Sequence, residues 1–341
     1  MRTSQSVFLG ENAVRDYLNP DYAQETPLVE LPKALNPFAD KGVSILAKCA
    51  FLNPLLHVKW YVTYNMLLEA AEAGQLKAGD KIVENSSGNT ASALAVLARA
   101  FGAGHLQAIL PADIPAGKQD ILRVMGAEPV LHIKEPGGPT GIERSRQLGA
   151  RPGMFNPSQY DNPANPRGAE KWLGPEIWKQ TDGRLSVFCA ALGTTGTIIG
   201  TAAYLRRATD SHRLPRIVGV ACAPGNAVPG ARSFERLKEV GFDWRGALDN
   251  YVEGETRESF LWSATLTAIG ILGGPTSGLA LAGLIRFLGK VVDDGALDQI
   301  RNEDGKVVAV FLCPDTPLLY LDKYSTHLDP EDFQALRALS I

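Results

Sequence analysis

Cysteine and histidine are scarce in this sequence, with four cysteines and five histidines among 341 residues. The cysteines lie far apart, form no C-x-x-C pair and have no histidine at metal-ligand spacing; they are Cys49, Cys189, Cys222 and Cys313. Disulfide frameworks are typical of short secreted chains, and structural zinc needs clustered ligands. We therefore expect neither a disulfide framework nor a bound metal.

The sequence also lacks long apolar runs and blocks of one charge. No stretch approaches the roughly 18 apolar residues of a membrane-spanning helix, and the first residues contain no apolar core of a signal peptide. The 34 Lys and Arg nearly balance the 37 Asp and Glu, so the net charge is −3. Nucleic acids and anionic membranes attract basic surfaces, and neither is expected as a partner. We expect a cytoplasmic protein that acts on a small molecule.

Apolar segments alternate between strand-like and helix-like periods from about residue 43 onward. A chain of this length, 45% hydrophobic and 21% charged, is expected to form two globular domains. Strands are expected at 43–49, 81–84, 106–110, 129–133, 185–191, 216–221 and 307–312. Helices are expected at 58–74, 90–101, 116–125, 169–181, 198–207 and 276–288. This order predicts an α/β fold with parallel sheets that carry helices on both faces.

A glycine-and-threonine turn, Leu-Gly-Thr-Thr-Gly-Thr at residues 192–197, lies between an apolar run and a helix-like stretch. Glycines let the backbone approach an anion, and the N–H groups at a helix N-terminus donate hydrogen bonds to it. The pattern therefore predicts a phosphate site. Ordinary turn chemistry explains the same residues equally well.

Three further stretches hold residues that suit a cofactor site. The Ser-Ser-Gly-Asn-Thr stretch at Ser86–Thr90 follows a strand and opens a helix, which suits a carboxylate, although a plain N-cap is the simpler interpretation. Lys59 has apolar neighbours, so desolvation would make it a nucleophile unless its amine reaches solvent. Thr276, in Gly274–Gly278, stands where a helix N-cap is expected.

Taken together, these stretches resemble the cysteine synthase family of pyridoxal-phosphate (PLP) enzymes, the fold-type II group that includes cystathionine β-synthase and threonine dehydratase. Residues 51–59 resemble the family's N-P-x-x-S-V-K segment, and Gln159–Trp178 resembles Q-F-x-N-P-A-N-P followed by G-P-E-I-W. The other matching stretches are 86–90, 111–130, 193–197, 274–278 and Pro314-Asp315. The resemblance runs from about residue 40 to residue 325.

The resemblance implies two three-layer α/β domains of the tryptophan synthase β-like architecture. Residues 1–54 and 161–341 would form a large cofactor-binding domain, and residues 55–160 a small mobile domain that carries the substrate loop. A shift to Pro, Asn and Asp over Pro152–Arg167 agrees with a crossing between domains, and residues 223–260 are expected to form loops and edge elements. The resemblance also implies a homodimer.

It further implies roles for individual residues. Lys59 would hold pyridoxal 5'-phosphate as a Schiff base and then take the Cα proton of the amino acid. Asn89 would bind the cofactor's phenolic oxygen, and Thr276 would face its pyridine nitrogen. The residues implied to bind the cofactor phosphate are Gly193, Thr194, Thr195, Gly196 and Thr197. The residues implied to bind the substrate are Ser86, Ser87, Gly88, Thr90 and Gln159.

A hydroxyl at the pyridine nitrogen makes the ring a weaker electron sink than a carboxylate would, and this favours loss of a β-leaving group. The resemblance therefore implies β-replacement on O-acetylserine or O-phosphoserine through an aminoacrylate intermediate, with sulfide or an amine as nucleophile. Such an enzyme is a transferase or lyase of amino-acid metabolism. The alternatives are a serine or threonine dehydratase and a catalytically degenerate binding protein. A nicotinamide dehydrogenase is disfavoured because no G-x-G-x-x-G follows a first strand.

The sequence departs from the family around the lysine. Leu55-Leu56-His57 stands where small residues are usual, Trp60-Tyr61 replaces Asp-Arg, and residues 316–320 lack the usual polar groups. These changes put sulfide in doubt as the nucleophile. His57 is interpreted as a space filler rather than an added acid or base, and Trp60 as a core residue. Arg232 is a candidate for binding the phosphate of a phosphoserine substrate.

Overall fold

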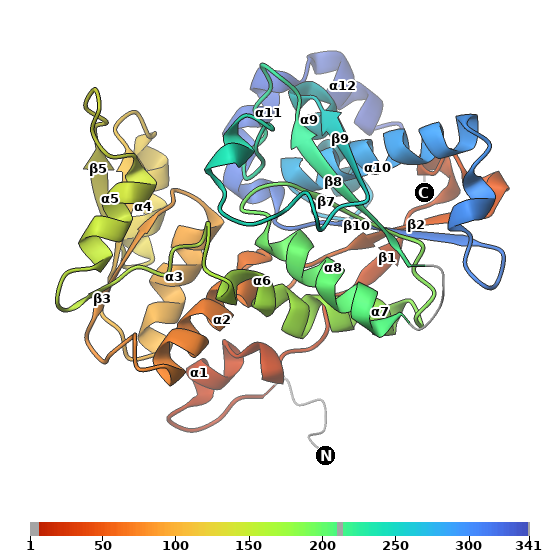
Figure 1. Ribbon diagram of the computed structural model, residues 1–341. Coiled ribbons are helices and arrows are strands. Elements are labelled where there is room, and N and C mark those ends of the chain that lie inside the picture. Colours follow the sequence, from red (N-terminus) through yellow and green to blue (C-terminus); the bar gives the residue numbers. More distant parts are fainter. Residues whose placement is uncertain (1–6, 210–213, 340–341) are drawn as a thin grey trace. The chain divides into compact units, whose positions relative to one another are not determined.

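The computed structural model describes residues 7–209 and 214–339 and divides into two compact units (Figure 1). The first unit comprises the chain up to Gln24 together with Lys59–Gly168, and the second comprises Glu25–Val58 together with the chain from Ala169 onward. The N-terminal segment therefore groups with the smaller unit, whereas the resemblance places it in the large domain.

The first unit contains a four-stranded parallel sheet in the order β5-β4-β3-β6. Its strands are β3 (Lys81–Asn85), β4 (Leu106–Pro111), β5 (Glu128–His132) and β6 (Met154–Phe155). Its helices are α1 (Ala13–Tyr17), α2 (Lys59–Glu72), α3 (Asn89–Ala100), α4 (Ala116–Val124), α5 (Gly141–Gly149) and α6 (Ala164–Gly168), with a 3-10 turn at Pro20–Tyr22. Because the strands are parallel, the loops that follow β3 and β4 leave the sheet at the same edge.

The second unit contains a six-stranded sheet in the order β1-β2-β10-β7-β8-β9, in which only β1 runs antiparallel to its neighbour. The strands are β1 (Leu28–Glu30), β2 (Val43–Lys48), β7 (Val187–Ala191), β8 (Arg216–Cys222), β9 (Asn250–Gly254) and β10 (Val307–Leu312). The central strands are apolar and buried, as strands covered on both faces must be.

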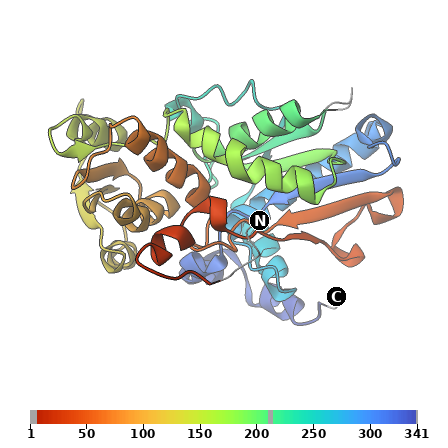
Figure 2. The ribbon, with the colours of Figure 1, turned by 90° about the horizontal axis from the view of Figure 1, so that it is seen from below.

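The helices of the second unit are α7 (Gly174–Gln180), α8 (Gly196–Ala208), α9 (Thr256–Ala268), α10 (Pro275–Asp293), α11 (Leu321–His327) and α12 (Pro330–Leu336). Its 3-10 turns are Lys33–Leu35, Ala39–Lys41, Arg236–Glu239, Leu297–Ile300 and Pro317–Tyr320. Helices α7 and α8, green in Figure 2, run beside the sheet. Strands β2 and β10 are far apart in the sequence but pair in parallel. This pairing places the segments that follow the two strands side by side.

Helix α10 corrects one expectation. By length and composition it is apolar enough to cross a membrane, with a mean hydropathy of 1.2, whereas the sequence predicts no such run. In the structure 67% of this stretch is buried within the protein, against the sheet and α9. Its apolar character is therefore explained by packing in the core.

The predicted α/β fold with parallel sheets is confirmed, and every predicted strand is present to within two residues at its ends. The predicted helix over 169–181 is wrong in one respect, because it begins as a π-helical turn at Ala169–Leu173 before α7. Helices α5 and α9 have no counterpart among the predicted elements. Thr140 caps α5 with a capping box to Glu143, a signal that the sequence does contain.

Candidate cofactor and substrate site

The glycine-and-threonine turn follows β7 and begins α8 in the second unit. A Cβ atom on Gly193 would lie 2.4 Å from the carbonyl oxygen of Gly230, so only glycine fits there. Thr195 has a φ of 67°, a left-handed conformation that is rare for a β-branched residue. A backbone hydrogen bond fixes the start of the loop, because the Arg232 N–H donates to the Leu192 carbonyl at 2.8 Å.

Two hydroxyls of this loop lie in the protein interior without a partner. Thr195 and Thr197 are each less than a tenth exposed, and no group in residues 7–209 or 214–339 forms a hydrogen bond with either Oγ1. Buried hydroxyls are normally satisfied, so these two point to a ligand. The first N–H groups of the 13-residue helix α8 lie at the same place and favour an anion. The loop therefore fits the phosphate of a PLP cofactor.

Thr276 is brought to the same part of the second unit. It lies in the first turn of α10, and its Oγ1 donates to the Pro229 carbonyl at 2.6 Å. Gly230, which follows Pro229 in the chain, has a φ of 82° and lies against both Gly193 and the Thr276 hydroxyl. Since its proton is committed to Pro229, the Thr276 oxygen keeps lone pairs that can accept a hydrogen bond.

The serine-rich loop belongs to the first unit and joins β3 to α3. Ser86 Oγ accepts hydrogen bonds from the N–H groups of Gly88, at 3.4 Å, and Ala91, at 3.3 Å, and so closes the turn before α3, whose N-cap residue is Gly88. Thr90 Oγ1 donates to Gln159 Oε1 at 2.6 Å. The structure thus brings Ser86, Thr90 and Gln159 together, although Gln159 is about 70 residues away along the chain.

Lys59 is the first residue of α2 and follows the end of the second unit's N-terminal segment. The preceding N–H, of Val58, donates to the Pro314 carbonyl at 2.7 Å. Trp60 is fully buried, and its Nε1 donates to the Leu18 carbonyl at 2.7 Å, which confirms its interpretation as a core residue. The lysine is therefore the first residue of a helix anchored by the tryptophan that follows it.

Two of the departures from the family pattern, Leu55-Leu56-His57 and residues 316–320, lie in the second unit. His57, which is buried, forms an isolated backbone bridge with Asp315. Beside this bridge, Leu56 is 51% exposed with a φ of 60°, and Leu318 is 56% exposed. Both segments that differ from the family therefore place leucines at the surface next to the segment that ends at Lys59.

The backbone N–H of Arg232 binds the carbonyl of Leu192, the residue just before the phosphate loop. Its Nη1 donates to Glu239 at 2.7 Å and to the Arg236 carbonyl at 3.0 Å. The charge of this arginine is thus already balanced by a carboxylate in the second unit.

Two buried carboxylates lie near these loops: Asp315, in the stretch Pro314-Asp315 that resembles the family, and Glu84, for which the sequence gives no signal. Asp315 is almost fully buried, and its Oδ2 accepts from the Tyr320 hydroxyl at 2.8 Å. Its carbonyl accepts from the Gly274 N–H at 2.9 Å, which fixes the turn before Thr276. Glu84 lies at the end of β3 and contacts the backbone of Gln159. An isolated acidic residue near the end of an apolar strand, such as Glu84, does not indicate from sequence alone that its carboxylate will bind a distant backbone N–H.

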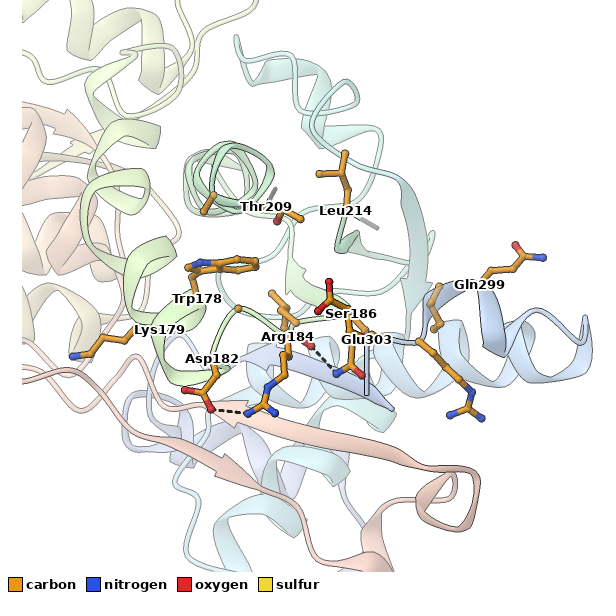
Figure 3. A pocket seen from close by; sticks show the side chains of 15 residues that line it. Trp178, Lys179, Asp182, Arg184, Ser186, Thr209, Leu214, Gln299 and Glu303 are labelled. Carbon is orange, nitrogen blue, oxygen red and sulfur yellow. Dashed lines mark hydrogen bonds and ion pairs between the residues drawn. The ribbon is translucent and has the colours of Figure 1, made fainter. Parts of the chain in front are cut away.

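A cavity of about 500 Å³ lies elsewhere in the second unit, near the amino end of β7 (Figure 3). Trp178, Arg184 and Ser186 are among the residues that line it. Arg184 forms ion pairs with Asp182 at 2.7 Å and Asp304 at 2.9 Å. None of the residues predicted for the cofactor or substrate lines this cavity, and the phosphate loop follows the opposite end of the same strand.

Comparison with known proteins identifies the family of this chain. The sequence profile of a family described as "Pyridoxal-phosphate dependent enzyme" matches residues 21–311. Cysteine synthase B of Salmonella typhimurium is 32% identical over 288 residues, covering 84% of this chain and 89% of the relative. The cysteine synthase of Aquifex aeolicus is 32% identical over 302 residues, covering 87% and 88%.

Among solved structures, O-ureido-L-serine synthase superposes with a TM-score of 0.75 at 25% identity, covering 94% of this chain and 98% of that one. With a matched family profile over most of the chain and relatives of this identity, the cofactor is pyridoxal 5'-phosphate. The chain belongs to the family of pyridoxal-phosphate dependent enzymes that includes the cysteine synthases.

Proposed function

We propose that this enzyme catalyses β-replacement on an O-activated L-serine. The observation that carries the proposal is the arrangement in the second unit. The loop of Thr195 and Thr197, whose buried hydroxyls have no partner among the described residues, approaches Gly230 through Gly193, and Gly230 lies against the Thr276 hydroxyl. A hydroxyl rather than a carboxylate at the pyridine nitrogen favours loss of a β-leaving group. The names of the similar proteins, cysteine synthase and O-ureido-L-serine synthase, describe products of this kind.

In this proposal the cofactor, when bound, supplies the electron sink for removal of the Cα proton. The Nζ of Lys59 holds the cofactor and then accepts and returns that proton. Asn89 binds the phenolic oxygen and Thr276 faces the pyridine nitrogen. The cofactor phosphate is bound by Gly193, Thr194, Thr195, Gly196 and Thr197. The substrate carboxylate is bound by Ser86, Ser87, Gly88, Thr90 and Gln159.

The donor in this proposal is O-acetylserine rather than O-phosphoserine. A phosphate leaving group would need a cation, and Arg232, the candidate from sequence, already pairs with Glu239. The nucleophile is sulfide or an amine. The departures from the family pattern beside Lys59 leave sulfide in doubt, so both nucleophiles are tested below.

The remaining proposals concern the whole molecule. Residues 55–160 form a small mobile domain that carries the substrate loop, and residues 1–54 and 161–341 form the large cofactor-binding domain. The enzyme is a cytoplasmic homodimer that acts on amino acids, and it binds neither nucleic acid nor membranes.

Product analysis tests the reaction. The purified enzyme is given O-acetyl-L-serine or O-phospho-L-serine, each with sulfide, with a primary amine or with no nucleophile, and products are identified by mass. A new β-substituted amino acid that appears only with a nucleophile supports β-replacement. Pyruvate and ammonia formed equally without any nucleophile would instead identify a dehydratase. If the PLP-loaded enzyme acts on neither donor, a degenerate binding protein becomes the better account.

A further inference from the structure

The side chain of Glu84 has no role in the reaction proposed above, yet Glu84 lies in β3 just before the substrate loop Ser86–Thr90. Glu84 is in β3, an inner strand of the first unit's sheet, and is 1% exposed. Buried carboxylates are rare without a cationic partner, because removing the charge from water is costly. This position therefore calls for a reason beyond packing.

Both carboxylate oxygens of Glu84 bind backbone N–H groups. Oε1 accepts from the N–H of Asn85 at 2.8 Å, and Oε2 accepts from the N–H of Gln159 at 3.1 Å. Asn85 leads directly into the Ser86–Thr90 loop. The carboxylate thus joins the root of that loop to the separate segment that carries Gln159.

Gln159 extends the same connection. Its side chain accepts from Thr90 Oγ1 at 2.6 Å and donates to the Asn85 carbonyl at 3.1 Å. Asn165 fixes its carbonyl through a 2.7 Å hydrogen bond from Nδ2. Glu84 and Gln159 therefore hold the loop at both ends, at Asn85 and at Thr90.

The charged groups around Glu84 do not neutralise it. Arg146 of α5 and Asp161 pair with each other at 2.5 Å, so their effects on Glu84 oppose one another. On the elements packed against β3, α5 also carries Arg144 and Glu143, which accepts from the Thr140 N–H, and Arg99 of α3 donates to the Met125 carbonyl. Strands β4 and β6 carry no charged residue. Burial is the dominant effect and raises the pKa of Glu84 to about 7, although the two N–H groups oppose it.

We propose that Glu84 is a positioning residue for the amino-acid substrate: its ionised carboxylate holds the Ser86–Thr90 loop and Gln159 in their binding arrangement, and its protonation loosens both. A carboxylate accepts from two N–H donors at once. The protonated acid carries an O–H that faces a donor, so one of the two bonds weakens. The inference rests on the proposed function in that this loop binds the substrate carboxylate.

The test is the KM of the holoenzyme for O-acetyl-L-serine between about pH 6 and pH 8.5, in the wild type and in Glu84→Gln. The carboxamide presents an NH₂ to one of the two donors at every pH, so we expect a KM about 10-fold higher at high pH with kcat within about 3-fold. The ratio of the two KM values should fall towards one as the pH falls below 7. Titration of the substrate amine is common to both enzymes and cancels in the ratio.

Glu128→Gln is the matched control, because Glu128 lies in the same sheet, is exposed, and forms its side-chain hydrogen bonds within the described residues with His105 and Gln107. It should leave both KM and its pH dependence unchanged. A KM ratio for Glu84→Gln that is near one at high pH, or that stays constant across the range, would overturn the proposal.

Hydrogen exchange supplies a readout that needs neither turnover nor a folded variant. In the wild-type holoenzyme, amides of residues 85–90 and 159 should lose protection between about pH 8 and pH 6, once the intrinsic pH dependence of exchange is removed. Unchanged protection would overturn the role of Glu84. Absence of turnover with either donor would defeat the proposed function while leaving this exchange result to stand on its own.

Discussion

Two loops at the carboxyl ends of parallel strands carry the predicted ligand-binding residues, and they differ in how their hydroxyls are satisfied. In the second unit, the Thr195 and Thr197 hydroxyls of the phosphate loop have no partner within the described part of the chain. In the first unit, Ser86 and Thr90 of the substrate loop are both hydrogen bonded. A loop with unpaired buried donors is preorganised for a permanent ligand. A loop whose groups bind one another must exchange those bonds when a transient ligand arrives.

The largest expected effect is at the lysine that both ligands require. Replacing Lys59 with alanine removes the group that holds the cofactor and moves the Cα proton, so we expect turnover to fall by about 10³-fold or more. Steady-state assays with O-acetyl-L-serine measure this. Lys81→Ala, an exposed lysine at the start of β3, should have no such effect. Near-normal turnover in Lys59→Ala would break the assignment of the site.

The next effect tests whether the phosphate loop is rigid. In Gly193→Ala the new methyl group would meet the Gly230 carbonyl, and a loop displaced by about 1 Å should bind PLP about 10²-fold more weakly. Equilibrium titration of the apoenzyme with PLP measures this. Gly289→Ala, on α10 where there is room for a methyl group, should keep full affinity and raise stability by up to about 1 kcal/mol. Unchanged PLP affinity in Gly193→Ala would show that the loop accommodates the methyl group and is not rigid.

The free energy of unfolding should depend on pH through Glu84, in the direction opposite to the loosening of the substrate loop. Because burial raises the pKa of Glu84 from 4.5 to about 7, the folded state binds its proton more tightly than the unfolded state. This group's contribution is therefore fully present below pH 4.5 and is lost as the pH rises through 7, a change of ~3 kcal/mol at most. Urea unfolding of wild type and Glu84→Gln across this range measures it. Parallel pH dependences would remove this contribution from the account.

The smallest effect separates a ligand-binding hydroxyl from a merely buried one. Thr197→Val should weaken PLP binding about 10-fold, because one donor to a charged phosphate is lost. The same change should leave the apoenzyme equally stable or slightly more stable, since an unpaired buried hydroxyl is removed. Thr201→Val, one turn further along α8 and also buried without a partner, is the control and should leave PLP affinity unchanged. Equal losses in both variants would contradict the comparison of the two loops.

The sequence predicts those parts of the molecule in which local pattern and tertiary structure agree. Strands such as Val307–Leu312 are apolar throughout, and the Gly193–Thr197 turn lies between a strand and a helix as its residues indicate. The roles of Lys59 and Asn89 came from the family resemblance. Spacing alone leaves simpler interpretations open, and in the structure Ser86 closes the turn while Gly88 is the N-cap residue of α3.

Long-range contacts explain most of what the sequence does not predict. Glu84 and Gln159 are 75 residues apart, and nothing in either segment indicates that a carboxylate will receive the N–H of Gln159. The meeting of His57 with Asp315 depends on the pairing of β2 with β10. The sequence does not predict helix α9, because its Ser and Thr residues interrupt the apolar pattern. The apolar length of α10 is explained by its packing against the sheet, a contact between distant parts of the chain.

The visible absorption spectrum of the purified holoenzyme tests the central claim most directly. The spectrum is recorded before and after O-acetyl-L-serine is added, and then after a nucleophile is supplied, with Lys59→Ala alongside. The account predicts a band of bound cofactor that shifts with O-acetyl-L-serine, returns when the nucleophile is consumed, and is altered from the start in Lys59→Ala. A wild-type protein that shows no such band even with excess PLP would contradict the account.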